Sequence, residues 1–167
     1  ATTTVTVGAF SALELGASDG TTGDVAAHQI DVGSNATVRG NGALEADVAL
    51  GDGATLDPGF SVGRISIDGQ YTQNRGSRLT IDIEGNADGQ FDLLDISGDA
   101  QLGGTLIVDG SSNNGIVPGA AIEFLRAREV RGVFEEVVVT PPADSYAKLA
   151  YAETGVAVLF PTHGDMD

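Results

Sequence analysis

The chain has no cysteine and no tryptophan, and its 167 residues include a single methionine. Without cysteine there can be no disulfide, no thiolate metal ligand and no cysteine nucleophile. Basic residues are also scarce: 8 Lys and Arg stand against 24 Asp and Glu, for a formal net charge of −16. Such a surface repels a phosphate backbone and anionic lipid, so we expect neither nucleic acid nor a lipid surface as a partner.

Long hydrophobic runs are missing as well, so the sequence predicts no membrane insertion. The chain starts at Ala1, without an initiator methionine or a signal peptide, and passes directly into Thr-rich sequence. Such a start is expected for a mature exported protein after removal of its signal peptide. It is equally expected for a fragment of a longer protein.

Glycine is abundant instead, with 24 residues, and the apolar residues are mainly Val, Leu, Ile and Ala. This composition favours short strands joined by glycine turns over a helical bundle. The acidity keeps such a β-rich surface soluble and opposes sticking between fibres. Divalent cation binding and life in a salty medium are two further interpretations of it.

A six-residue spacing runs through the first part of the chain. Residues 32–38 align without gaps with residues 50–56, at an offset of 18. Aliphatic residues recur every six positions within and around this unit: Val32, Val38, Leu44, Leu50, Leu56 and Val62. A helix would need spacings of three and four, so the pattern predicts triangular coils of about 18 residues whose aliphatic side chains stack inside.

From residue 63 onward the spacing becomes irregular and the predicted strands lengthen. We expect one all-β solenoid domain over residues 1–160, with hexad-spaced coils at 1–62 and wider coils with longer strands at 63–160. Residues 161–167 read as a polar tail. The arithmetic of the repeat does not fix the handedness of the coils.

Several runs in residues 42–160 resemble the stem of autotransporter passenger proteins. The runs are GATLDPGFSVGRISI at 53–67, GQYTQ at 69–73, GSRLTIDI at 76–83, GQFDLLDISG at 89–98, AQLGGTL at 100–106, GVF at 132–134 and TGVAV at 154–158. The resemblance implies a right-handed parallel β-helix with a structural role in a secreted or cell-surface bacterial protein. In that family a translocating domain follows the stem. We expect either that this part has been removed here or that this protein uses the stem alone.

Candidate catalytic residues are better explained without catalysis. His28 and His163 are the only histidines, and no nucleophile-elbow motif accompanies them. Carboxylate pairs such as Asp92 with Asp95 and Glu135 with Glu136 are expected by chance in so acidic a chain. We therefore predict no catalytic residue, and a polysaccharide lyase or hydrolase is the third-ranked alternative. Three arginines are expected to pair with nearby glutamates: Arg126, Arg128 and Arg131 with Glu123, Glu129 and Glu135.

An adhesin that holds calcium or a glycan is the second-ranked alternative. Residues 86–92 place Asn86, Asp88 and Asp92 around Gly89, which allows calcium, although an EF-hand glutamate is missing. An ordinary turn between two strands explains the same residues and is favoured, so no cofactor is predicted. Aromatic residues make up 5% of the chain, which argues against a glycan-binding aromatic row.

A solenoid exposes unpaired strand edges at both ends, and this favours self-association. The β-prone segment Thr2, Thr3, Thr4, Val5, Thr6 and Val7 either completes the first coil of its own chain or adds to the edge of a neighbour. In the second case residues 151–160 are the expected acceptor, and copies link head to tail. We expect a non-catalytic shaft, stem or fibre subunit.

Overall fold

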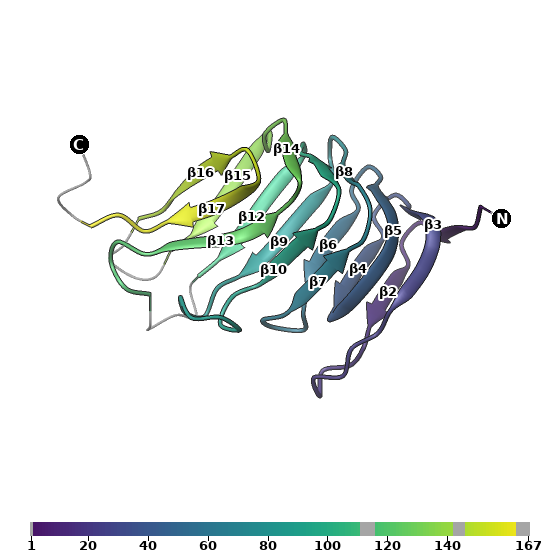
Figure 1. Cartoon of the computed structure of the whole chain (residues 1–167), viewed down its shortest axis with the longest axis horizontal. Coiled ribbons are helices and arrows are strands. Elements are labelled where there is room, and N and C mark those ends of the chain that lie inside the picture. Colours follow the sequence, from purple (N-terminus) through teal and green to yellow (C-terminus); the bar gives the residue numbers. More distant parts are fainter. Residues whose placement is uncertain (1, 111–115, 142–145, 163–167) are drawn as a thin grey trace.

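The computed structural model describes residues 2–110, 116–141 and 146–162, which form an all-β protein with seventeen strands and no helix (Figure 1). An eleven-stranded sheet contains β1 (Thr4–Val7), β3 (Val25–Val32), β5 (Gly42–Leu50), β7 (Arg64–Ile67), β8 (Tyr71–Gln73), β10 (Leu93–Ile96), β11 (Asp99–Gln101), β13 (Ala121–Arg126), β14 (Glu129–Arg131), β16 (Lys148–Ala152) and β17 (Gly155–Leu159). A six-stranded sheet contains β2 (Ala12–Leu15), β4 (Thr37–Gly40), β6 (Thr55–Pro58), β9 (Arg78–Asp82), β12 (Thr105–Asp109) and β15 (Glu136–Thr140).

The chain passes repeatedly from one sheet to the other, and every strand pair formed by β1 to β15 is parallel. From β7 on, each pass contributes three strands. β7, β8 and β9 pair in turn with β10, β11 and β12, and β13, β14 and β15 follow. At the end of the chain, β17 pairs antiparallel with both β13 and β16, which makes the larger sheet mixed.

The passes differ in length along the chain. Val32 aligns with Leu50 and Thr37 with Thr55, so in this part of the chain the step between strands equals the offset of the sequence repeat. This one step has the expected spacing of 18 residues. The step before it, from Ala12 to Thr37, is longer, and the late step from Leu94 to Leu125 is longer still. The added residues lie in turns and extra short strands rather than in longer ones.

The prediction of longer strands in the second part of the chain is therefore wrong. The longest strands are β3 with 8 residues and β5 with 9, and both lie in the first part. Among the strands described after residue 63, none exceeds the 6 residues of β13. A third strand in each later pass shortens every strand, because the chain bends once more before it returns to the first sheet.

The hexad-spaced side chains form the interior. Val32, Val38, Leu44, Leu50 and Leu56 are at most 2% exposed, whereas Val62 is half-buried in the turn before β7. Strand registers stack such residues into columns, and one column crosses the whole smaller sheet: Leu13, Val38, Leu56, Leu79, Leu106 and Val137. Burial of each such side chain contributes roughly 1.5–3 kcal/mol. One pass alone cannot bury its own apolar face, so this stabilisation requires stacked neighbours.

Two glycines permit the close approach of successive passes near β4 and β5. Gly40 and Gly42 have φ angles of 112° and 155°, which L side chains rarely adopt. A Cβ atom at Gly40 would overlap the carbonyl oxygen of Leu15, and one at Gly42 would overlap that of Gly23. Both positions therefore require glycine. Among the described residues, no helix has the length and apolar character needed to cross a membrane.

Candidate functional site

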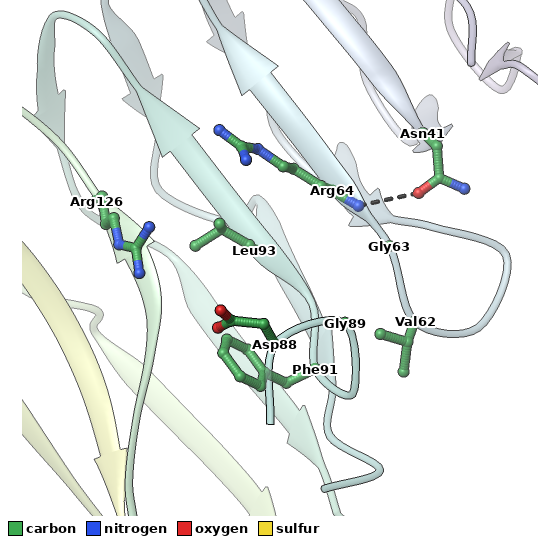
Figure 2. Close-up of a pocket in the computed structure, with 9 residues that line it drawn as sticks. All are labelled: Asn41, Val62, Gly63, Arg64, Asp88, Gly89, Phe91, Leu93 and Arg126. Carbon is green, nitrogen blue, oxygen red and sulfur yellow. Dashed lines mark hydrogen bonds between the residues drawn. The ribbon is translucent and has the colours of Figure 1, made fainter. Parts of the chain in front are cut away.

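A groove follows the outer surface of the eleven-stranded sheet. It consists of two hollows, of about 420 and 510 Å³, that share Asn41, Val62 and Arg64. The first hollow, drawn in Figure 2, extends past Leu93 toward Arg126, and Asp88, Gly89 and Phe91 line it as well. The second extends toward the segment before β3 and is lined also by Gly20, Thr22, Asp24, Gly42, Ala43 and Ser66.

Strand stacking positions the groove residues. Arg64 lies directly beside Leu93 in the register of β7 and β10, and Arg126 follows on β13, beside Asp95. Figure 2 shows the Leu93 side chain between those of Arg64 and Arg126. Asn41 links the turn before β5 to the start of β7, because its Oδ1 accepts a hydrogen bond of 3.0 Å from the Arg64 backbone N–H.

The groove combines an apolar wall with planar polar groups. Phe91 and Val62 are half-buried, so their apolar surfaces remain partly accessible. The two guanidinium groups are balanced by carboxylates: Arg64 pairs with Asp95, and Arg126 pairs with Glu123 at 2.6 Å. The groove is therefore not a strong anion site. An aromatic face beside amide, carboxylate and guanidinium groups suits a neutral sugar ring better.

A cluster of three carboxyl groups, which we call the acid triad, consists of Asp57, Asp82 and Asp92, and Asp92 contacts the groove residue Gly63. Their carboxylate oxygens lie within 4.8 Å of one another. Asp92 is fully buried, and its two oxygens accept hydrogen bonds of 2.7 Å from the backbone N–H groups of Gly63 and Asp82. Asp92 thus ties the turn before β7 to the end of β9.

Burial dominates the electrostatics of the acid triad. It raises the pKa of Asp92 to about 9, although the two N–H donors lower it, and the neighbouring carboxylates Asp82 and Asp57 raise it further. Burial and then Asp82 raise the pKa of Asp57 to about 6, against the attraction of Arg39. The pKa of Asp82 is also raised, first by burial and then by Asp109 and Glu84. Near neutral pH the triad therefore holds fewer than three charges.

The acid triad has a limited set of oxygens for a metal ion. Calcium takes six to eight oxygen ligands. Both oxygens of Asp92 already accept backbone hydrogen bonds, which leaves Asp57 and Asp82 as the free carboxylates of the cluster. The structure also separates the residues of the 86–92 segment, because Asp92 is buried in the triad whereas Asp88 is exposed and lines the groove. That segment does not converge on one ligand position.

The other acidic and basic candidates form pairs on the surface. Arg126 pairs with Glu123 and Arg131 with Glu129, at 2.6 and 2.8 Å, as predicted. The remaining partners differ from the prediction, because the stacking of passes brings together residues far apart in the sequence. Arg128 bonds Asp99 at 2.8 Å, and Glu135 bonds Arg75 at 3.1 Å.

The remaining candidates do not come together. His28 is exposed on β3, and His163 lies outside the described residues. Asp92 points into the acid triad, whereas Asp95 lies beside Arg64 on the outer surface. Glu136 is exposed on β15 next to Glu135.

The N-terminal segment takes the first of its two expected roles in this structure. Thr4–Val7 forms β1 and pairs with β3 of the same chain, Val7 beside Val32. Thr3 precedes it and accepts a hydrogen bond of 2.8 Å from the His28 backbone N–H. The expected acceptor at 151–160 is wrong for β17, because β13 and β16 occupy both of its edges.

Sequence reasoning missed the acid triad. Asp57 lies on β6 and Asp82 on β9, and only the register of unequal passes brings these distant positions together. The alternation of Leu79, Ile81 and Ile83 with polar residues indicated that Asp82 lies on the opposite face from the core. Nothing in the sequence indicated that Asp92 turns inward. The chain matches no protein-family model and no curated protein sequence.

Proposed function

We propose that this chain is a non-catalytic structural module, a shaft or stem, of an exported bacterial surface or extracellular protein. We further propose that its fold is a right-handed parallel β-helix. The observation that carries this proposal is the apolar column from Leu13 to Val137, which continues through every strand of the six-stranded sheet. A stack of this kind is stiff along one axis and presents regular outer faces.

The strand topology supports the helical part of the proposal. Successive passes pair in parallel in both sheets, and their buried residues belong to one core cluster. About 98% of the crossover connections between parallel strands of one sheet are right-handed, which favours the right-handed form. The motif resemblance of residues 42–160 to autotransporter stems favours the same form and an exported location.

The use of charge supports a structural role. Six of the seven arginines form ion pairs with acidic residues. Four of these pairs join residues from different passes: Arg39 with Glu14, Arg64 with Asp95, Arg75 with Glu135 and Arg128 with Asp99. Exposed pairs of this kind contribute little singly. Three of the four join neighbouring passes, whereas Arg75 and Glu135 are two passes apart.

Whole-pass insertion tests the proposal. Residues 33–50 make up one full pass, so four extra copies placed after residue 50 should fold and lengthen the molecule. At roughly 4.8 Å per strand spacing, the gain should be about 19 Å. Small-angle scattering measures this length, and circular dichroism measures the strand content.

The matched control inserts residues 33–41 once after residue 50. This half pass shifts the following strand into the wrong sheet, so we expect loss of cooperative unfolding. If full passes disrupt the fold as badly as the half pass does, the stacked-shaft proposal is wrong.

The groove favours a second candidate function, an adhesin-like module that binds a neutral glycan. If so, a glycan array should give a reproducible hit, and Phe91→Ser should weaken its binding at least about tenfold by removing the aromatic wall. Phe10→Ser is the matched control, since Phe10 is 82% exposed and lies outside the groove. An array without hits would exclude this candidate.

A further inference from the structure

The two ends of the six-stranded sheet have free edges of the same kind. β2 pairs only with β4, and β15 pairs only with β12, among the strands described. All pairs in this sheet are parallel, so both edges run in the same direction. Figure 1 shows β2 and β15 near opposite ends of the molecule. A copy shifted along the stack would therefore place its β2 on β15 in the parallel sense.

The interior column is left open at the β15 end. Val137 continues the column of Leu56, Leu79 and Leu106, yet it is 40% exposed, and none of the described strands continues the sheet beyond it. Val133, four residues earlier in the chain, is also exposed, as is Tyr151, whose ring centroid lies 6.3 Å from that of Phe134. Unpaired edges that also expose apolar residues are positions where another strand adds.

The β2 end carries a complementary feature. Phe10, just before β2, is 82% exposed and has a φ of 60°, a conformation that bulky residues rarely adopt. Leu13 begins the interior column and is only half-buried. A strained, exposed aromatic side chain at the end of an otherwise polar surface indicates a contact surface.

We propose that β15 of one molecule receives β2 of a second copy, so that the six-stranded sheet continues from molecule to molecule. In a register that continues the column, Leu13 lies beside Val137, Ala12 beside Glu136, and Glu14 beside Val138. No like charges then face each other directly, and Glu14 keeps its partner Arg39 at 3.6 Å. The contact is heterologous, so it produces open chains rather than closed dimers.

This inference rests on the proposed shaft function and names its partner. It differs from strand exchange by the N-terminal segment, because β1 remains paired with β3 of its own chain. The formal net charge of −16 opposes the association, and added salt should therefore promote it.

Sedimentation velocity of the full chain at about 0.5 M NaCl tests the proposal, where screening is strong. We expect concentration-dependent linear oligomers, which electron microscopy shows directly. Val137→Lys and Phe10→Lys should each weaken association at least about tenfold, because each places a charge in the contact. Val117→Lys, at a valine that is 57% exposed before β13, is the control and should associate like the wild type.

Mixing the two variants identifies the arrangement. Equal amounts of the Val137→Lys and Phe10→Lys proteins share one intact contact, so they should form heterodimers but no longer chains. A wild type that stays monomeric at all salt concentrations would overturn the proposal, as would oligomers unaffected by Val137→Lys. Either result leaves whole-pass insertion as an independent test of the shaft.

Discussion

Replacement of Leu56 by alanine is expected to lower the free energy of unfolding by about 2–5 kcal/mol. Leu56 is fully buried in the middle of the column, with Val38 on one side and Leu79 on the other. The adjacent passes are held in place by their ladders of hydrogen bonds, so they cannot close the cavity. Equilibrium unfolding in guanidinium chloride measures the change.

A matched pair of substitutions separates column packing from side-chain chemistry. Val38 and Val137 occupy the same column, but Val38 is fully buried whereas Val137 is 40% exposed. Val38→Ala should cost about 2 kcal/mol or more, and Val137→Ala under about 1 kcal/mol. Equal losses would contradict a continuous interior column that ends at β15. The measurement is best made at low salt and low protein concentration, where association does not contribute.

Raising the pH from about 5 to 9 is expected to destabilise the protein through the acid triad. The pKa of Asp92 is raised to about 9 and that of Asp57 to about 6, whereas an unfolded aspartate titrates near 4. Between these values the folded state binds more protons than the unfolded state. The stability that Asp92 and Asp57 contribute is therefore fully present below the unfolded pKa. It is lost as the pH rises through the pKa values of the folded state. Each such proton contributes about 1.4 kcal/mol per pH unit at most.

Asp92→Asn tests the origin of this dependence. The asparagine side chain has one acceptor oxygen where Asp92 offers two, so it cannot bond the N–H groups of both Gly63 and Asp82. We therefore expect the variant to be less stable than wild type at pH 5. Because it does not titrate, the difference should shrink steadily toward pH 9. Asp88→Asn removes an exposed carboxylate outside the triad and should follow the wild-type curve. Parallel curves for wild type and Asp92→Asn would refute the assignment to Asp92.

The interior of the first passes could be predicted from the sequence because its spacing is regular. Five of six hexad positions are buried, and Thr37 lies beside Thr55 and Val38 beside Leu56, at the offset of 18 residues that the repeat predicts. Only local periodicity is needed for this prediction, because equal spacing between turns repeats the same inward-facing positions. Once the passes differ in length, the sequence no longer gives the register.

That loss of register explains what the sequence did not predict. The pairing of Arg75 with Glu135 joins strands two passes apart, which no local pattern encodes. The antiparallel hairpin of β16 and β17 was expected as part of a continuous solenoid, and it instead covers one sheet end. The groove arises in the same way, because Asn41, Arg64 and Arg126 meet only through the offsets of three successive steps.

The described parallel strands pair with strands of successive passes, and this has a consequence for how the chain acquires its structure. Even the long step from Leu94 to Leu125 joins neighbouring strands, and the step from Thr37 to Thr55 is much shorter. Each new strand can therefore pair once a limited further length of chain is present. A polypeptide that emerges gradually through a narrow opening can therefore order itself stepwise. Each completed layer is the template for the next, and the ordered part resists slipping back.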